Sequence, residues 1–284
     1  MKGTLALRRE VLGMKHPDMI ASMADLAAAY HQQGWYDEAE EIKVKALELQ
    51  QETLGEKHPD TIRSMVDLAT TYYAQAPYGK DEEVSTRVLQ LRRETLGERH
   101  PDTIQSMAEL ATTYHAQGRY DKVEEIETKV LELRRDILGE KHPDTIRSMA
   151  ELAATYQARG RYSEAEVVRV RVLDLQRELL GGRNPSTIWS MALLAATYHA
   201  QGQHGKAEAV KIKVLGLRRE VLGQNHHDTL QAMHDLAVTW ESQGRRDDAI
   251  ALMDEGLQLG RGVLGPNHPF ISHSNRALVS WMNK

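Results

Sequence analysis

A turn sequence, Gly-x-x-His-Pro, returns along this 284-residue chain at a constant interval of 42 residues. Its glycines are Gly13, Gly55, Gly97, Gly139, Gly181, Gly223 and Gly265. The His-Pro pair is intact in five copies and has become Asn184-Pro185 and His226-His227 in the other two. No insertion or deletion interrupts the interval. Units of constant length stack on their neighbours, so this regularity predicts a repeat architecture with one continuous core.

Each 42-residue unit predicts two helices. The first begins after the His-Pro pair, where Asp, Ser and Thr suit a helix N-terminus. It ends at a second glycine series, in which Ala76 is the exception: Gly34, Gly118, Gly160, Gly202 and Gly244. The second helix is longer, is acidic early and basic late as the helix dipole favours, and ends at the next Gly-x-x-His-Pro turn.

Apolar residues mark the buried face of each predicted helix. On the first helix of one unit these are Ile62, Met65, Leu68, Ala69 and Tyr72, and the same types recur 42 residues later. The second helices carry a leucine series, seen at Leu47, Leu49 and Leu54 and again at Leu89, Leu91 and Leu96. A single helix pair cannot bury both stripes, whereas a stack of pairs can. The expected fold class is therefore all-α, an α-solenoid of antiparallel helix pairs.

We expect residues 1–284 to form a single solenoid without linkers. Its predicted parts are a half helix at 1–13, full units at about 16–57, 58–99, 100–141, 142–183, 184–225 and 226–267, and a capping helix at 268–284. Asn275 and Arg276 replace the usual Met and Ala in the last helix, which suits an exposed end. The start in the middle of a helix suggests a fragment or a shortened relative of a longer protein.

Composition excludes several classes of function. The chain has no cysteine, which excludes disulfides, thiolate metal sites and cysteine nucleophiles. Its 36 Lys and Arg against 41 Asp and Glu lack the basic footprint of a nucleic-acid-binding protein. No apolar run is long enough for a membrane span, and the first residues do not resemble a secretory signal. These features predict a cytoplasmic protein without nucleic-acid or membrane partners.

The sequence gives no support for catalysis, a metal or a cofactor. Six of the 13 histidines open the repeated turns, one per unit, and we interpret them as capping or turn residues rather than metal ligands. No zinc-binding His spacing, phosphate loop, dinucleotide fingerprint or nucleophile elbow is present. The methionines that recur every 42 residues share the phase of the core stripe, which indicates packing. We therefore predict a protein that is not an enzyme.

One stretch resembles the tetratricopeptide repeat: Leu152, Ala153, Tyr156, Gly160, Tyr162 and Ala165 in the pattern Leu-Ala-x-x-Tyr-x-x-x-Gly-x-Tyr-x-x-Ala. The ordinary repeat has about 34 residues, so this 42-residue form lengthens the second helix and its exit. It is similar to the repeats of kinesin light chains and to the near-identical repeats of fungal NOD-like receptors. The resemblance implies a right-handed superhelix and a protein-binding scaffold, with the ligand-sensing region of a larger receptor as one expectation.

Candidate binding residues lie on the face of the first helices that is opposite the core stripe. The resemblance implies that this face lines a concave groove. The candidates are Arg63, Asp67, Gln105, Glu109, His115, Arg147, Glu151, Trp189, Leu193, His199, His234 and Asp235. One explanation is a solvated polar surface without a specific ligand. The other is a ladder of acids that favours a basic ligand, interrupted by an apolar anchor.

The anchor is Trp189 with Leu193, one helical turn apart, where other units carry Arg or Gln and an acid. Kinesin light chain-like repeats usually carry Asn at the acidic position, so the resemblance does not transfer a peptide-clamp role to it. Nearby His234 stands where other units have Ala or Val and adds a titratable group. These features predict a protein or peptide partner with basic residues and an apolar anchor residue.

Two alternatives remain open at this point. The groove could hold a small molecule or act as a noncanonical enzyme, with Glu151, His199, His234 and Asp235 as acid–base groups. The chain could instead be a structural module, because the truncated first helix leaves an apolar edge for end-to-end self-association.

Overall fold

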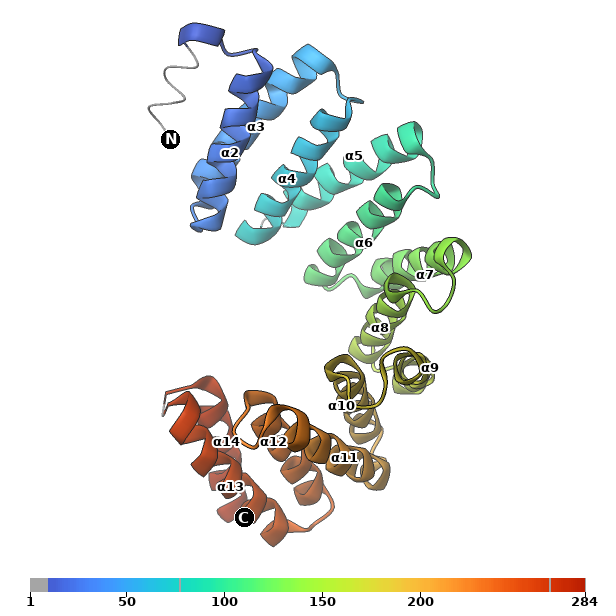
Figure 1. Cartoon of the computed structure of the whole chain (residues 1–284), viewed down its shortest axis with the longest axis vertical. Helices are drawn as coiled ribbons and strands as arrows, with labels where there is room; N and C mark the ends of the chain where they lie inside the picture. Colours follow the sequence, from blue (N-terminus) through green and yellow to red (C-terminus); the bar gives the residue numbers. More distant parts are fainter. Residues whose placement is uncertain (1–9, 77, 266, 284) are drawn as a thin grey trace. The chain divides into compact units, whose positions relative to one another are not determined.

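The computed structural model describes residues 10–76, 78–265 and 267–283, and these residues form helices joined by short turns (Figure 1). The predicted half helix at 1–13 falls mostly outside the described residues. The described helices are α2 (Pro17–Gln32), α3 (Tyr36–Leu54), α4 (Pro59–Gln75), α5 (Tyr78–Leu96), α6 (Pro101–Ala116), α7 (Tyr120–Leu138), α8 (Pro143–Ala158), α9 (Tyr162–Leu180), α10 (Pro185–Ala200), α11 (His204–Leu222), α12 (His227–Ser242), α13 (Arg246–Leu264) and α14 (Pro269–Met282). The predicted all-α class of consecutive helix pairs is confirmed.

Even-numbered helices are the first helices of the units, and each begins with the same side-chain cap. In α4, His58 Nδ1 accepts a hydrogen bond from the backbone N–H of Asp60 at 3.2 Å, and a proline occupies the first turn. The same cap forms at His16, His100, His142, His226 and His268. Asn184 replaces the imidazole by an amide oxygen that accepts from Ser186 N–H at 2.9 Å. The predicted capping role of the turn residues is confirmed.

The second glycine series ends the even-numbered helices in the left-handed backbone region. Gly34 has a φ of 78°, and Ala76 keeps this conformation with a φ of 72°. Among the described residues, Ala76 is the one non-glycine residue with positive φ. Side chains disfavour this region, so the constant repeat geometry imposes backbone strain at Ala76.

From α2 to α12, the predicted core stripe of the even-numbered helices is buried at its first four positions. Its aromatic position is buried at Tyr30, Tyr72 and Tyr114 but only half-buried at Tyr156, Tyr198 and Trp240. Its methionines are all buried: Met23, Met65, Met107, Met149, Met191 and Met233. The leucine series of the second helices is buried at Leu49, Leu89 and Leu91. Leu54 and Leu96 are exposed, so the prediction was wrong for them. Each is the last residue of its helix, where the chain turns away from the core.

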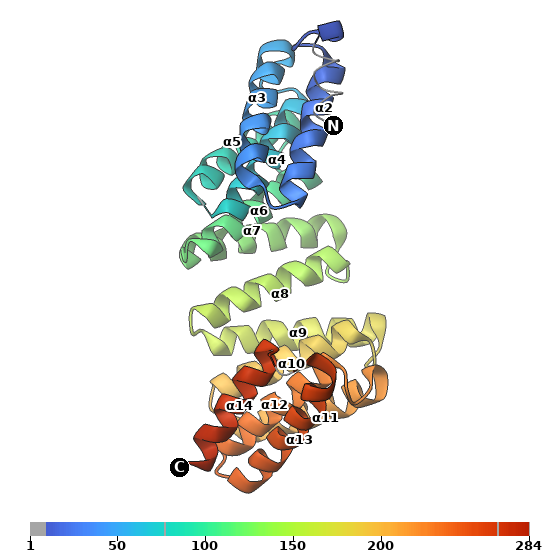
Figure 2. The ribbon, with the colours of Figure 1, turned by 90° about the vertical axis from the view of Figure 1, so that its left-hand side faces the viewer.

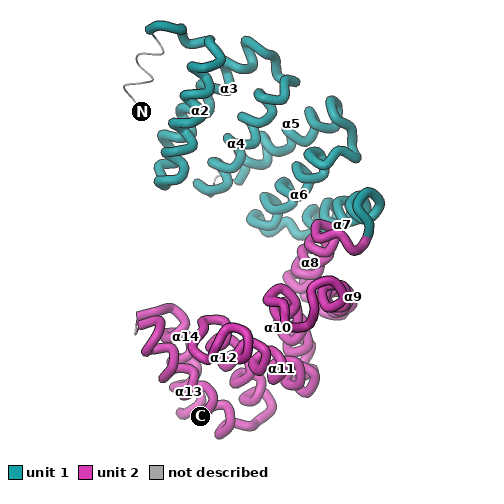
Figure 3. The backbone as a smooth tube through the Cα atoms, viewed as in Figure 1, with its two compact units in different colours: residues 1–139 teal, residues 140–284 magenta. Residues whose placement is uncertain are grey.

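The described chain divides into two compact units, residues 1–139 and 140–284 (Figure 3). Within each unit, consecutive helices pack in chain order and run in alternating directions (Figure 2). Packing thus joins α2 to α7 in unit 1 and α8 to α14 in unit 2. The single continuous solenoid over 1–284 stays a prediction. None of the described helices combines the length and apolar character that crossing a membrane would require.

Candidate functional site

Three pockets occupy equivalent places in the repeats. Each lies between an even-numbered helix, the second helix of that unit and the next even-numbered helix. The Lys43 pocket, of about 210 Å³, lies among α2, α3 and α4. The Asp81 pocket, of about 200 Å³, lies among α4, α5 and α6. The Lys211 pocket, of about 340 Å³, lies among α10, α11 and α12 and is also lined by His273 of α14. The fold therefore offers the same recess in both units.

In two of these pockets, a lysine side chain of the protein itself supplies a buried ammonium group. Lys43 Nζ donates to the backbone oxygen of Asp67 at 2.6 Å and to Thr71 Oγ1 at 2.7 Å. Lys211 Nζ donates in the same way to the backbone oxygen of Asp235 at 2.8 Å and to Thr239 Oγ1 at 2.7 Å. Burial lowers the pKa of both ammonium groups, because it disfavours the charged form.

Arg169 stands at the equivalent position in α9. Its guanidinium donates to the backbone oxygen of Leu193 at 2.6 Å and to Thr197 Oγ1. Burial lowers the pKa of Arg169 as well. A buried cation that bonds the next even-numbered helix is thus a recurring element of this fold.

Histidines adjoin the two lysines. His31 Nδ1 and His199 Nδ1 each lie 3.3 Å from the hydroxyl of the threonine that the lysine contacts. Burial is the main cause that lowers the pKa of His31 and His199, and the nearby ammonium group lowers it further. The predicted site residue His199 therefore belongs to the Lys211 pocket.

His234 lines the same pocket but is only 6% exposed. Its Nδ1 lies 2.9 Å from Ser274 Oγ on α14, and its ring packs against Phe270 and His273. Burial lowers the pKa of His234, an effect that the charge of Asp235 opposes. The α12–α14 contact therefore holds this imidazole in place.

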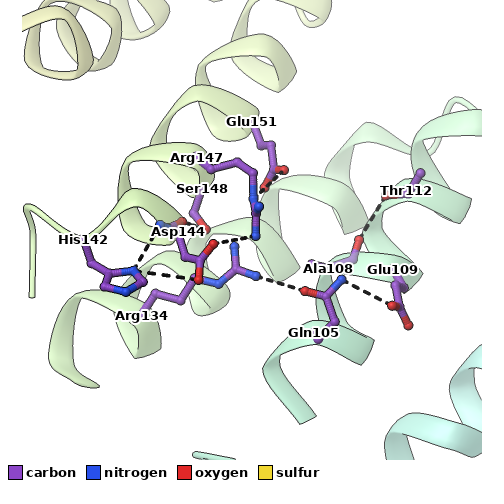
Figure 4. A network of polar contacts seen from close by, with 10 residues as sticks. All are labelled: Gln105, Ala108, Glu109, Thr112, Arg134, His142, Asp144, Arg147, Ser148 and Glu151. Carbon is purple, nitrogen blue, oxygen red and sulfur yellow. Dashed lines mark hydrogen bonds and ion pairs between the residues drawn. The ribbon is translucent and has the colours of Figure 1, made fainter. Parts of the chain in front are cut away.

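Three of the four predicted acids line the pockets, and two of these three, Glu109 and Asp235, accept a hydrogen bond from a glutamine amide on the same helix. Asp67, Glu109 and Asp235 line the Lys43, Asp81 and Lys211 pockets respectively. Gln105 Nε2 donates to Glu109 at 3.2 Å, and the Gln105 amide oxygen accepts from Arg134 at 3.4 Å (Figure 4). Pairing of this kind weakens the negative potential that a bare acidic ladder would produce.

Unit 2 shows a second pairing pattern. Arg147 lies 2.8 Å from Asp144 and 3.9 Å from Glu151, so one guanidinium serves two carboxylates (Figure 4). In unit 1, Arg63 pairs with Asp60, and the exposed His115 ring packs 5.3 Å from Tyr120. The candidates Arg63, Gln105, His115 and Glu151 line none of the four pockets described in this section.

A fourth pocket, of about 620 Å³, surrounds Trp189 in unit 2. It brings together three of the predicted site residues, Arg147, Trp189 and Leu193. Trp189 is 56% exposed and Leu193 is half-buried. Its further apolar walls are Ile146, Leu179, Leu180, Ile188, Val221 and Leu222. We call this recess the Trp189 pocket.

Sequence reasoning missed several residues of these sites. The apolar residues Leu179, Leu180 and Val221 end the second helices, where the repeat pattern suggested only core. The buried cations were missed because Lys and Arg on a helix usually face solvent. The available signal was a threonine with the 42-residue period, found at Thr71, Thr113, Thr155, Thr197 and Thr239. Among the described residues, no three His, Asp or Glu side chains cluster as metal ligands would.

Comparison with known proteins agrees with this architecture. One tetratricopeptide repeat model matches residues 18–79, 82–136, 128–168 and 169–220, and a second matches 61–102 and 229–270. Nearly identical TPR-like repeats of a kinesin light chain-like protein from Podospora anserina are 29% identical, with a TM-score of 0.65 over 72% of this chain and 97% of that one.

Two more distant structures share the fold alone. BtubC from P. vanneervenii is 18% identical, with a TM-score of 0.63 over 88% of this chain and 92% of its own. A signal transduction ATPase with numerous domains (STAND) from Pyrococcus horikoshii, which has a tetratricopeptide repeat sensor, is 15% identical, with a TM-score of 0.70 over 93% of this chain and 38% of its own. No protein of curated function matches. On the family models, which cover most of its length, the chain belongs to the tetratricopeptide repeat family.

Proposed function

We propose that this protein is a binding scaffold without catalytic activity, which takes a peptide or an extended protein segment on the even-numbered helices. The observation that carries the proposal is the exposure of Trp189 within a recess of about 620 Å³. Trp189 is exposed together with Leu179, Leu180 and Val221 in one recess, and a contiguous exposed apolar patch is typical of an interaction site. Aromatic residues in such recesses supply much of the binding free energy at protein interfaces.

The walls of the Trp189 pocket suit an apolar side chain of the partner. Leu179, Leu180 and Val221 are 40–50% exposed there, so an inserted side chain would remove apolar surface from water on several sides. Arg147, Arg218 and Asp228 supply polar groups at the same recess, which can fix the orientation of a segment.

Acidic residues on the even-numbered helices of unit 2 are the reason to propose a partner that carries basic residues. Asp235 and Glu151 lie in unit 2, as does the Trp189 pocket; Glu151 is exposed 3.9 Å from Arg147, and the half-buried Asp235 carboxylate accepts a hydrogen bond from the neutral Gln231 amide at 2.9 Å. They support a partner with basic residues flanking an apolar anchor. A role as the ligand-sensing repeat region of a larger receptor, in the cytoplasm, is a further part of this proposal.

Peptides selected from a random display library on the intact protein provide the test. The selected peptide is titrated calorimetrically into the wild type and Trp189→Ala, and we expect binding at least about tenfold weaker in the variant. Trp35→Ala is the matched control, because Trp35 is also about half exposed but lies in unit 1. Equal affinities for wild type and Trp189→Ala would remove the basis of the proposal. The double variant Trp189→Ala with Asp235→Ala then measures the contribution of the acid.

A small-molecule ligand is the second candidate function, on a separate observation. His199, Lys211, His234 and Asp235 converge on one pocket of about 340 Å³. Such a set could bind or transfer protons to a small polar molecule. Native mass spectrometry of the purified protein should then show a bound mass that is lost in Lys211→Ala. A bare polypeptide mass under gentle conditions argues against this candidate.

End-to-end self-association remains a prediction of the sequence. Sedimentation velocity at several concentrations tests it, because an assembling chain sediments faster as concentration rises. A constant monomer coefficient would contradict it.

A further inference from the structure

Asp81 is a buried carboxylate at a position where the other 42-residue repeats carry a small apolar residue. The equivalent residues are Ala39, Val123, Ala165, Ala207 and Ala249. Asp81 lies in the first turn of α5 and is 3% exposed.

The hydrogen-bond donors around Asp81 are neutral. Ser85 Oγ donates to Oδ1 at 2.9 Å, and Thr113 Oγ1 donates to Oδ2 at 2.7 Å. Among the described residues, no Lys, Arg or His forms an ion pair with this carboxylate within 4 Å. Burial of a carboxylate without a cation carries a large desolvation cost, which a positively charged ligand would offset.

Equivalent positions elsewhere in the chain show what kind of ligand fits. Ser85 occupies the repeat position of Lys43, Arg169 and Lys211. In those units the cation donates to the threonine of the next even-numbered helix. In the Asp81 pocket the cation is missing, and the corresponding Thr113 donates instead to a carboxylate. The same recess thus contains a positive charge in the Lys43 and Lys211 pockets and a negative charge here.

The remaining walls match an aliphatic stem. Val66, Ala69 and Val88 line the apolar side of the Asp81 pocket, and Tyr73 is exposed at its surface. Glu109 adds a second carboxylate, half-buried, from α6. An apolar recess with carboxylates is complementary to a long alkyl chain that ends in an ammonium group.

We propose that the Asp81 pocket binds the side chain of a lysine in the partner segment. Asp81 and Glu109 face the ammonium group, and the apolar walls contact the methylene stem. The partner lysine thereby takes the role that Lys43 and Lys211 play within the chain. The inference rests on the proposed function only for the source of the lysine, because the pocket lies in unit 1 and its chemistry is independent of Trp189.

The test uses a lysine with capped ends, Nα-acetyl-lysine methylamide, titrated into the isotopically labelled full chain and followed by amide NMR shifts. Nα-acetyl-norleucine methylamide, which lacks the ammonium group, is the matched probe. We expect saturable shifts in α4, α5 and α6 with the lysine probe and at least tenfold weaker binding with the norleucine probe. Equal responses to the two probes would overturn the proposal.

Variants sharpen the result. Asp81→Asn keeps the shape of the side chain but removes its charge, and should weaken lysine-probe binding at least tenfold. Ser85→Lys places a lysine side chain in the Asp81 pocket, as Lys43 does in the Lys43 pocket. This side chain should occupy the place of the probe and abolish its binding. Glu132→Gln on the exposed surface of α7 is the control for the change in net charge and should bind like the wild type. Wild-type affinity in both Asp81→Asn and Ser85→Lys would contradict the assignment. None of these measurements uses the display peptide, so they can fail while the Trp189 proposal stands.

Discussion

The Asp81 and Lys211 pockets are built from the same three helix positions, yet their chemistry is opposite. In the Lys211 pocket a buried ammonium donates to Thr239 and to a backbone oxygen. In the Asp81 pocket a buried carboxylate accepts from Thr113 and Ser85. The comparison shows that the repeat determines where a recess forms, whereas single departures from the repeat determine which ligand it can take.

The largest expected effect comes from removing the internal cation. Lys211→Ala loses two hydrogen bonds and a buried aliphatic stem, so the free energy of unfolding of the protein should fall by about 2–3 kcal/mol. Ser85→Ala at the equivalent position loses one hydrogen bond and should cost about 1 kcal/mol. Urea unfolding followed by circular dichroism measures both. Similar losses in the two variants would show that the pockets do not differ as described.

Lowering the pH should reduce the stability contributed by the Lys211 pocket more than that contributed by the Asp81 pocket, because His199 and His234 line the Lys211 pocket. Burial lowers the folded-state pKa of both histidines, and the charged or titratable groups that face them are Lys211, His204, Asp235 and His273. As pH falls below about 6.5, the unfolded chain binds protons more readily than the folded chain. The contribution of these two histidines to the free energy of unfolding should therefore be complete above about pH 6.5. It should be lost progressively as the pH falls from there to their lowered folded-state pKa values.

His234→Ala isolates one part of this effect, since alanine is the residue at the equivalent positions 108, 150 and 192. The variant should lose less stability than the wild type between roughly pH 7.5 and 5.5. Thermal unfolding across this range measures the difference. An unchanged pH dependence in His234→Ala would exclude the imidazole as its source.

The turn that precedes the Asp81 pocket offers a smaller effect. Ala76 has the left-handed conformation that glycine has at the equivalent turns. Ala76→Gly should stabilise the protein by about 0.5–1 kcal/mol, and the reverse change Gly118→Ala should destabilise it by about 1 kcal/mol. Melting temperatures of the two variants provide the check. A lower melting temperature for Ala76→Gly would contradict the assignment of strain.

The smallest effect should come from Asp81 itself. Asp81→Ala restores the small residue of the other units and removes a charge without a cation, so we expect the free energy of unfolding to change by less than about 1 kcal/mol. Chemical denaturation measures this change. A loss above about 3 kcal/mol would assign Asp81 to folding rather than to ligand binding.

The fold follows from the sequence because its determinants are local and periodic. The turn histidines cap helices through a backbone N–H two residues away, and the buried methionines recur with the helix phase. Exposure of Trp189 was also predictable, since Ile188 and Met191 already occupy the core phase of α10.

The pocket chemistry was not predictable in the same way. Lys211 bonds Thr239, 28 residues away, and Asp81 bonds Thr113, 32 residues away. Each bond joins two helices of neighbouring 42-residue repeats. From the sequence alone, a charged residue on a helix is expected to face solvent, because the position of the neighbouring helix that buries it is not known. The convergence of Leu179, Leu180 and Val221 on Trp189 likewise depends on how second helices end in space.

Hydrogen–deuterium exchange of unit 2, in the full chain with and without a library-selected peptide, tests the central claim most directly. Binding at the Trp189 pocket should slow exchange in residues 143–150 and 185–193, which line it. The Trp189→Ala variant should lose that protection. Protection confined to α13, or protection that survives Trp189→Ala, would contradict the claim that this recess anchors a partner segment.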